Sequence, residues 1–425
     1  MDTTKYTRRI TPDTQRYTAA IFLHGPIMSI PLHRTLNLAQ ITLYGIGSIL
    51  GAGIYVLLGE VALVSGTLLP LAFLGAALVV SFSAYSYRHL ARRFPQAAGE
   101  AVYVHEAFSS VPLSRLVGLT LVFSGMVSSA TIARGFTGYF SIIYPLPDVL
   151  MITVLVIGLT ALAIWGVRQA VAVAVATTVA ELFGIGLVIW ASYDSLPTLM
   201  DNPRQYFVPD SLPAWAGIAT GAFIAFYAFI GFEDMVNMAE EVENPERNMF
   251  LGILLALIIT ASLYIVVSLC AVAAVPMNEL AGAKAPLALI VERNSAFPVT
   301  IMALISLVAV INGALLQIIM CARVLYGMGK QHMLPGLFSR VHPRTRTPHI
   351  ATLLVGICVM IFALTLPLVT LAKITSTAIL GVFSLVNASL LRLNWRAPEK
   401  TVWQIVLPTT GTCICIAFIV LQLLV

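Results

Sequence analysis

Long apolar stretches follow one another along almost the whole chain, and this succession constrains the fold more than any other feature of the sequence. Hydrophobic residues make up 59% of the 425 residues and charged residues only 10%. Because a water-exposed surface normally carries about 25% charged residues, this composition excludes soluble domains, a disordered chain and a nucleic-acid binder. A transmembrane helix needs about 20 apolar residues, so we expect an all-α polytopic membrane protein with about eleven transmembrane helices in the lipid bilayer. The expected spans are 36–62, 65–87, 113–142, 148–166, 169–193, 213–241, 249–275, 297–327, 349–366, 369–391 and 402–424.

Lys and Arg residues are distributed unevenly between alternate loops. With the N-terminus inside, 19 of the 24 fall on the inner side, and the outer side holds Arg134, Arg204, Lys284, Arg293 and Lys373. Since inner loops of membrane proteins carry the excess of positive charge, the pattern predicts a multi-pass protein of the cell (plasma or inner) membrane with a cytoplasmic N-terminus. Residues 1–35 are then a cytosolic tail, and a start at Met28 in place of Met1 stays open for residues 1–27.

The first span is unusually rich in glycine. Gly45, Gly47, Gly51 and Gly53 fall within nine residues, although each glycine inside a helix costs about 1 kcal/mol relative to alanine. The spacing does not fit a dinucleotide-binding loop, which needs a strand before it and a helix after it. Two interpretations remain: a small-residue packing face through Gly47 and Gly51, or a helix that unwinds near mid-membrane and turns free backbone N–H groups toward a ligand.

The sixth span has a matching irregularity, because Gly231 is followed, after Phe232, by Glu233 and Asp234 about 18 residues into an apolar stretch. Acids at such depth face a cavity or a protein interior and are functional by default. Alternatively, the two acids cap the N-terminus of a resumed half-helix, where the helix dipole favours negative charge. Both interpretations place an interruption at Gly231.

The two interrupted spans occupy corresponding positions in two halves of opposite topology. Such a pair is the best sequence indicator of a transporter built from inverted repeats. We therefore expect a ten-helix transporter core at 36–400, with repeat one at about 36–193 and repeat two at about 213–392. Residues 401–425 form an additional peripheral transmembrane helix.

Four stretches make the chain resemble the amino acid–polyamine–organocation superfamily of permeases. They are GIGSILGAGIYV at 45–56, FPQAAGEAVYVHEAF at 94–108, AFYAFIGFEDMVNMAEEVENPERNM at 225–249 and CARVLYGMGKQHMLP at 321–335. The resemblance covers residues 36–400. It implies a leucine-transporter type 5+5 inverted-repeat bundle with discontinuous helices 1 and 6, and secondary active transport of amino acids by alternating access. Relatives commonly have twelve spans, so a twelfth helix lost by truncation stays open here.

The breaks suggest how a zwitterionic amino acid is held. The free N–H groups after the first break should bind the substrate carboxylate, and free carbonyls at the second should accept from its ammonium group. The resemblance supports this arrangement and gives Tyr227 the position of an aromatic gate, with a ring packed in the core as the alternative. The expected substrate-binding residues are Ile49, Gly51, Ala52, Gly53, Phe226, Tyr227, Phe229, Ile230 and Gly231.

Two acids at membrane depth are candidates for proton coupling. Glu181 lies within the fifth span and Glu233 beside the second break. In some relatives a lysine in a similar stretch of helix five stands in for a sodium ion, and the acid here excludes a direct transfer of that mechanism. A structural hydrogen bond is the alternative role for Glu181. Asn312 in the eighth span is expected to be a site residue or a polar packing residue.

The sequence lacks the motifs that are typical of other function classes. The sequence has no His-Glu-x-x-His and no Gly-x-Ser-x-Gly, so we expect no enzyme, no catalytic residue, no metal and no cofactor. We expect proton-coupled uptake of a neutral amino acid and favour a proton over sodium. A cationic amino acid or polyamine transporter, an amino acid exchanger and a non-transporting sensor on the same fold are the alternatives. The sequence leaves open whether the protein is a monomer or a homodimer.

Overall fold

The computed structural model describes residues 34–424 except 35, 51–52, 96–98, 166–169, 240, 331–332, 344, 346 and 399–400. Within these residues the chain is helical, and its one β-type pairing is the isolated bridge between Leu36 and Val242. The expected cytosolic tail, residues 1–35, lies outside the described part apart from Arg34.

The long helices coincide with the predicted spans. The first span is divided into α2 (Leu38–Leu50) and α3 (Gly53–Ser65). The sixth is divided into α10 (Leu212–Phe226) and the 3-10 segments η3 (Tyr227–Phe229) and η4 (Phe232–Met238). The undivided spans are α4 (Leu69–Arg93), α6 (Val111–Ile143), α7 (Asp148–Trp165), α8 (Ala170–Ser192), α11 (Pro245–Ala274), α14 (Val299–Lys330), α15 (His349–Thr365), α16 (Leu368–Trp395) and α17 (Val402–Leu424).

Length and composition confirm that these helices are suited to a bilayer. Nine helical stretches among the described residues have at least 18 residues and are apolar enough to cross a membrane. The first of them, Leu38–Arg93, contains the first two predicted spans, and the apolar helix His349–Thr365 is shorter, at 17 residues. The expectation of a polytopic all-α membrane protein is therefore confirmed.

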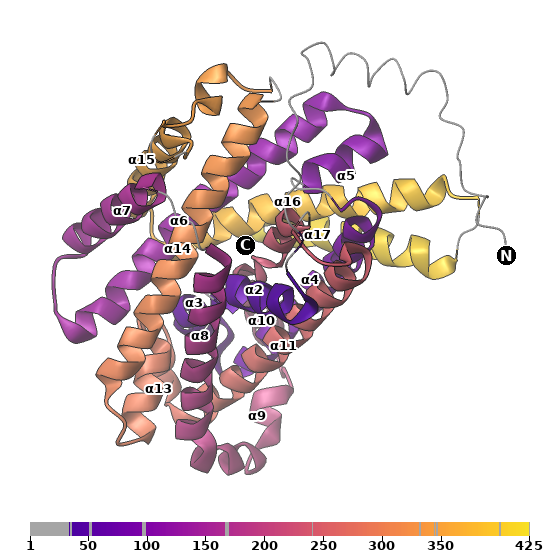
Figure 1. Ribbon diagram of the computed structural model, residues 1–425. Coiled ribbons are helices and arrows are strands. Elements are labelled where there is room, and N and C mark those ends of the chain that lie inside the picture. Colours follow the sequence, from indigo (N-terminus) through magenta and orange to yellow (C-terminus); the bar gives the residue numbers. More distant parts are fainter. Residues whose placement is uncertain are drawn as a thin grey trace, which may run out of the picture.

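Short helices lie at the two ends of the bundle. They are α5 (Gly99–Phe108), α9 (Pro203–Phe207), α12 (Met277–Leu280) and α13 (Pro286–Asn294), with the 3-10 segments η1 (Gly66–Leu68), η2 (Tyr193–Met200) and η5 (Gly336–Ser339). Figure 1 shows α5 at one end of the molecule and α9 and α13 at the opposite end. Local chemistry explains where the neighbouring long helices begin. The hydroxyls of Ser110 and Ser211 accept from backbone N–H groups at the start of α6 and α10, and a proline follows each serine at the first turn.

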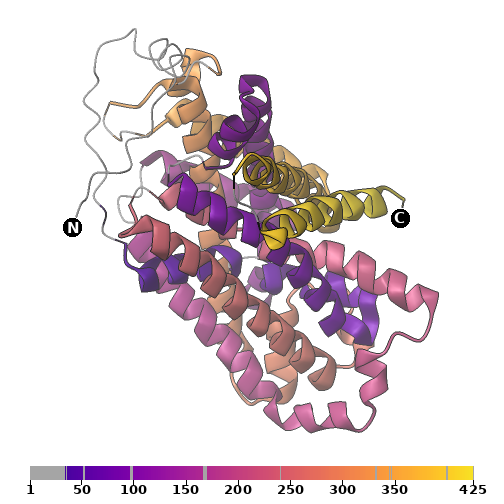
Figure 2. The same cartoon turned by 90° about the vertical axis from the view of Figure 1, so that its right-hand side faces the viewer.

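The divided helices α2, α3 and α10 lie inside the bundle. The inner neighbours of α2 are α8 and α11, while α3 packs against α10. The longest helix, α6, packs along α14 and α16, and α7 pairs with α15 at the side of the molecule (Figure 1). The last helix, α17, packs on α16 and α4 (Figure 2), and only 17% of its most apolar window is buried. It therefore lies at the periphery of the bundle.

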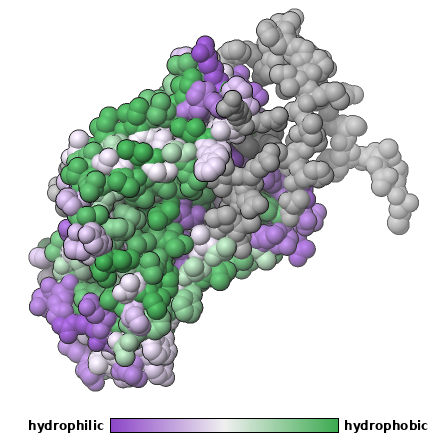
Figure 3. Space-filling model, turned by 60° about the vertical axis from the view of Figure 1, so that its left-hand side comes forward, coloured by the Kyte–Doolittle hydropathy of each residue, from purple (hydrophilic) through white to green (hydrophobic). Residues whose placement is uncertain are grey.

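An apolar belt covers the outside of the bundle. The face in Figure 3 is largely hydrophobic, and hydrophilic residues gather toward its ends. Large apolar side chains on the outside of the helices, such as Val154, Ile157 and Phe183, are exposed at 59–63% of their surface. A surface of this kind suits a lipid environment, in which apolar side chains need no burial against protein.

Candidate functional site

The break in the sixth span is a sharp change of backbone direction. Helix α10 tightens into the 3-10 segment η3, then Ile230 turns extended with ψ 136°, and Gly231 adopts φ 128°. A side chain at Gly231 would overlap the carbonyl oxygen of Ser48, which lies on the other broken helix. Glycine is therefore required twice here, by a conformation that other residues rarely adopt and by the close approach of two backbones.

The break in the first span lies directly beside it. Helix α2 ends at Leu50 and α3 begins at Gly53, while Gly51 and Ala52 lie outside the described residues. A Cβ atom at Gly53 would overlap the backbone of Ala228 in η3. The glycines also serve packing, as the alternative interpretation proposed, because a Cβ at Gly47 would overlap the hydroxyl of Thr178 on α8. The first span thus combines a packing face with an interruption.

A tyrosine from a third helix joins the two breaks. The hydroxyl of Tyr264 on α11 lies 2.9 Å from the carbonyl oxygen of Ile49 and 2.8 Å from that of Ala228. Its ring packs edge-on against Phe229, with ring centroids 5.0 Å apart. Carbonyl groups released by the interruptions are thereby partly satisfied within the protein, which a buried backbone requires.

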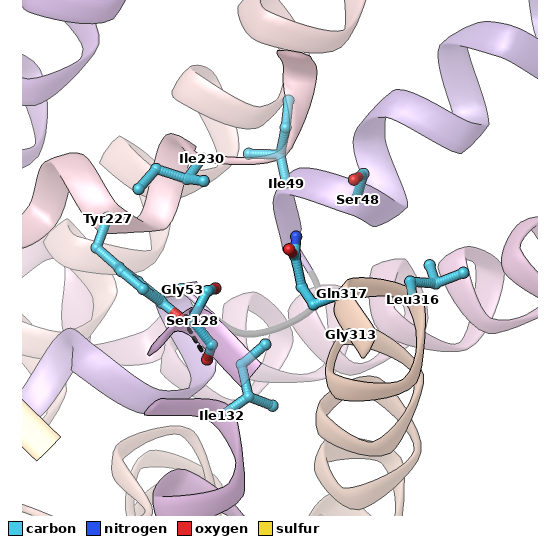
Figure 4. A pocket seen from close by; sticks show the side chains of 10 residues that line it. All are labelled: Ser48, Ile49, Gly53, Ser128, Ile132, Tyr227, Ile230, Gly313, Leu316 and Gln317. Carbon is cyan, nitrogen blue, oxygen red and sulfur yellow. Dashed lines mark hydrogen bonds between the residues drawn. The ribbon is translucent and has the colours of Figure 1, made fainter. Parts of the chain in front are cut away.

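A cavity lies between the two breaks and two uninterrupted helices, α6 and α14 (Figure 4). The empty space between its walls, mouth included, is ≈ 380 Å³. Its lining residues are Ser48, Ile49, Gly53, Ser128, Ile132, Tyr227, Ile230, Gly313, Leu316 and Gln317. Aliphatic side chains from all four sides meet small polar groups here, a composition typical of small-molecule sites.

Tyr227 forms one wall of this cavity through a fixed contact. Its hydroxyl lies 2.9 Å from the hydroxyl of Ser128 on α6 and 3.1 Å from the carbonyl oxygen of Ser128 (Figure 4). The ring is buried, with 3% of its surface exposed. It therefore bridges the broken sixth span and α6 across the cavity.

A second hollow continues from the first and shares Ser128, Ile230 and Gln317 with it. Its other lining residues are Leu121, Ser124, Gly125, Glu233, Asp234, Met320, Thr375 and Ile379. Since Leu121, Ser124 and Gly125 lie in the first half of α6, this hollow extends toward the end of the bundle at which α6 begins. Two carboxyl groups thus line a hollow that adjoins the first one.

Those two carboxyl groups have different partners. The Oε2 atom of Glu233 accepts from the backbone N–H of Gly231 at 2.8 Å, which is a capping bond at the resumed helix. The Oδ2 atom of Asp234 accepts from the hydroxyl of Ser48 at 3.1 Å and from the side-chain amide of Gln317 at 3.3 Å. Both acids are almost fully buried, and the ion pair found among the described residues, Arg293 with Glu279, lies elsewhere on the surface.

Four predicted site residues, Ile49, Gly53, Tyr227 and Ile230, line the cavity, and Gly231 forms the break beside it. Phe226 and Phe229 do not line either hollow. Phe226 packs against Phe383 of α16, and Phe229 against Tyr264. The tight 3-10 turn η3 directs Tyr227 and the extended Ile230 toward the cavity, while the two phenylalanines pack against α16 and α11.

Glu181 and Asn312 lie near the site without lining either hollow. Glu181 on α8 is fully buried, and neither of its carboxyl oxygens has a hydrogen-bond partner among the described residues. The hydroxyl of Tyr55 on α3 donates to its backbone carbonyl at 2.8 Å. The amide nitrogen of Asn312 is also buried without a described partner, and the next residue, Gly313, lines the cavity.

The sequence did not indicate Ser48 of α2 or the part of the site that comes from the uninterrupted helices α6 and α14. The missed lining residues are Ser48, Ser128, Ile132, Gly313, Leu316 and Gln317. Ser128 and Gln317 carried a usable signal, since both are polar residues in the middle of long apolar spans. The aliphatic residues carried none, because nothing distinguishes them from lipid-facing neighbours. No group of three or more His, Cys, Asp or Glu residues in the described part of the chain is placed to hold a metal ion.

Comparisons with known proteins agree with this architecture. Residues 36–425 match the family described as amino acid permease. The chain is 26% identical to the branched-chain amino acid permease BcaP of Bacillus subtilis (strain 168), over 87% of this chain and 82% of that protein. It is 30% identical to the mitochondrial cationic amino acid transporter 3 of Arabidopsis thaliana, over 87% of this chain and 64% of that longer protein. A methylthioribose transporter of B. subtilis is 27% identical over 91% of the chain.

The fold is that of a solved transporter. The structure of MhsT in complex with L-phenylalanine superposes with a TM-score of 0.64 at 13% sequence identity, and the match covers 92% of this chain and 99% of that one. The expected leucine-transporter type fold is therefore confirmed, with the interruptions in the first and sixth spans. The matching family is one of membrane permeases. The chain belongs to the amino acid permease family of the amino acid–polyamine–organocation superfamily.

Proposed function

We propose that this protein takes up a neutral amino acid together with a proton, and that the substrate binds in the cavity between the two helix breaks. The observation that carries the proposal is the lining of that cavity. Ile49, Ile132, Ile230 and Leu316 offer an aliphatic surface from four elements, and no charged residue is among the lining residues of this first hollow. Such a surface favours an apolar side chain, because burying a charged one without a partner is costly.

The main-chain end of the substrate has suitable partners at the same place. The first turn of a helix leaves N–H groups without intrahelical partners, and α3 begins at the cavity with Gly53. Those groups and the helix dipole favour a carboxylate. Ser48, Ser128 and Gln317 add neutral polar groups within reach of the ammonium end. Gly51 and Ala52, outside the described residues, stay part of the proposed carboxylate site.

A cationic substrate is the second candidate. Glu233 and Asp234 line the adjoining hollow, and they have no ion-pair partner among the described residues. A cationic amino acid or a polyamine reaching that hollow would supply a positively charged partner for these two acids. Exchange of one amino acid for another is a third candidate, and it uses the same cavity.

We propose that the coupling ion is a proton carried by a buried acid. Glu181 is enclosed by protein without a described hydrogen-bond partner for its carboxyl oxygens. A carboxylate in such surroundings costs several kcal/mol, so the group is expected to hold a proton in this state. Glu233 is the other candidate, because it lies at the break and lines the hollow next to the substrate cavity.

The proposal includes the placement of the protein in the membrane. We place it in the cell (plasma or inner) membrane with the N-terminus and the 328–348 loop on the cytosolic side, from the distribution of Lys and Arg. The proposed core of two inverted repeats then exposes the substrate cavity alternately to each side.

The test of the substrate is competition in reconstituted vesicles. Purified protein in proteoliposomes should take up radiolabelled leucine, and isoleucine and valine should compete better than lysine, arginine or putrescine. If mainly the cationic compounds compete, the substrate is a cationic amino acid or a polyamine and not a neutral amino acid. Binding of leucine in a thermal shift assay without any vesicle uptake would indicate a sensor and would contradict transport.

A further inference from the structure

Asp234 joins three separate parts of the site through one oxygen atom. Its Oδ2 atom accepts from the hydroxyl of Ser48, at the end of α2, and from the amide of Gln317 on α14. The side chain is 4% exposed. One buried carboxylate therefore holds a broken helix and an uninterrupted helix together beside the cavity.

The adjacent acid has no comparable reach. Glu233 is equally buried, but the bond recorded for its side chain goes to Gly231, two residues away in the same segment. It stabilises the turn into η4, and among the described residues it forms no side-chain hydrogen bond to a further helix. Among the two neighbouring acids, the link between helices thus belongs to Asp234.

The inner halves of the broken helices are already one unit. Before α2 begins, the backbone of Leu36 donates to the carbonyl of Glu241 at 3.0 Å and accepts from the N–H of Glu243 at 2.9 Å, just after η4 ends. At the other end of both segments, Gly231 at the start of η4 lies so close to Ser48 of α2 that a Cβ there would overlap the Ser48 carbonyl oxygen. Because α2 and η4 are joined at both ends, a change at Asp234 alters the contact between this pair of segments and α14.

The link also lies where the two hollows meet. Gln317 lines both of them, while Ser48 lines the first and Asp234 the second. A side chain held at this position closes the passage from the substrate cavity toward the end of the bundle where α6 begins. Moving Gln317 away from Asp234 would join the two hollows.

We propose that Asp234 is a positioning residue of the transport cycle: by holding Gln317 of α14 against Ser48 of α2 it keeps the inner wall of the cavity closed, and release of this link opens that wall. The inference rests on the proposed transport function, since it names the step that exposes the cavity to one side. It does not require Asp234 to contact the substrate.

A native cysteine can report this opening. Cys321 lies one turn beyond Gln317 on α14, is 2% exposed, and its Sγ atom lies 3.3 Å from the carbonyl oxygen of Val122 on α6. Its sulfur lies against Gly125, a lining residue of the second hollow, because a Cβ at Gly125 would overlap it. With the four other cysteines of the chain, Cys270, Cys358, Cys413 and Cys415, replaced by serine or alanine, the rate of alkylation by a water-soluble maleimide measures access to this hollow.

Purified protein without substrate is used, so the result does not depend on a transport assay. Asp234→Ala and Gln317→Leu should each raise the alkylation rate about tenfold, as expected when a buried hydrogen-bonding group loses its partner. The double variant should react no faster than either single variant, because both remove the same link. Asp234→Asn retains an acceptor and should fall between the parent and Asp234→Ala. Glu233→Gln, the matched loss of the neighbouring charge, should stay near the parent.

The opposite results would overturn the proposal. One is an alkylation rate in Gln317→Leu that equals that of the parent. Another is a double variant that reacts faster than either single variant. The third is a Glu233→Gln variant that is accelerated as much as Asp234→Ala. If Asp234→Ala does not fold, Gln317→Leu and Ser48→Ala decide, because each removes one donor and leaves the carboxylate in place. Failure of leucine uptake in proteoliposomes would contradict the proposed function and leave the alkylation result intact.

Discussion

At the scale of single residues, the two breaks depend on glycines whose neighbours leave no room for a side chain. Gly231 combines a positive φ with close contact to Ser48, and Gly53 lies against the backbone of Ala228. These contacts bring the ends of two broken helices together, which is what forms the cavity. A larger residue at either position must separate them.

We therefore expect Gly53→Leu to abolish transport without preventing membrane insertion. The substitution makes the span more hydrophobic, so the yield in membranes should hold, while the new side chain displaces η3 from the cavity wall. Gly158→Leu on α7 is the matched control, since nothing lies within 4 Å of a Cβ there, and it should transport like the parent. Parental uptake by a well-expressed Gly53→Leu protein would remove this position from the site.

A buried acid on the short helix α5 links pH to stability. Glu100 is 1% exposed and lies 3.4 Å from the hydroxyl of Tyr87, and burial raises the pKa of its carboxyl from 4.5 to about 8. The folded protein keeps this proton at pH values where the unfolded chain has released it. The free energy of unfolding should consequently decrease as the pH rises from 4.5 through about 8.

Glu100→Gln should flatten this dependence, because glutamine does not ionise and can still accept from Tyr87. The measurement is the thermal unfolding midpoint in detergent between about pH 5 and about pH 8, where the parent should lose more than the variant. Glu106→Gln, an exposed acid on the same helix, should retain the slope of the parent. A Glu100→Gln variant with the parental slope would show that this carboxyl does not hold its proton in the folded state.

At the scale of helices, Tyr264 is the connection between the two interruptions. Removing its hydroxyl leaves the carbonyl groups of Ile49 and Ala228 without this donor. Burying such groups without a partner costs about 1–3 kcal/mol. The two halves of each broken span would then be held less firmly in their positions relative to each other.

Tyr264→Phe should lower thermal stability and also change the KM for uptake. Tyr139→Phe is a control of the same chemical type, because Tyr139 donates to the carbonyl of Tyr55 at 2.6 Å, away from the cavity lining. It should lower stability without changing KM. Equal KM values in Tyr264→Phe and the parent, at reduced stability, would limit this tyrosine to a structural role.

The sequence allowed the helices and the breaks to be predicted, but not all of the walls. Hydropathy located the spans because lipid imposes a minimum apolar length, and Gly231 marked a break because glycine and buried acids are costly inside a membrane helix. The orientation of Phe226 and Phe229 could not be predicted, because it depends on a local change from α to 3-10 periodicity. The contributions of Ile132 and Leu316 could not be predicted either, since which face of α6 or α14 meets the breaks is decided by packing between distant helices.

At the scale of the whole molecule, the apolar belt and the charged ends fix how the bundle can lie in a bilayer, and the Lys and Arg distribution favours one direction. We expect a cysteine introduced at Val341 to be unreactive toward an impermeant maleimide in intact cells. A cysteine at Leu212, which is 85% exposed at the start of α10, should react. Strong labelling at 341 and none at 212 would reverse the topology.

In the proposed function, the central property of the protein is that it moves an amino acid against its gradient at the expense of a proton gradient. The measurement is accumulation of radiolabelled leucine in sodium-free proteoliposomes with an imposed pH gradient, acidic outside. The parent should concentrate leucine above the outside level, a protonophore should abolish this, and Glu181→Gln or Glu233→Gln should lose the response to pH. Uptake that never exceeds equilibrium, or that appears only when sodium is added, would contradict proton-coupled transport, and unchanged pH dependence in both variants would show that neither acid carries the proton.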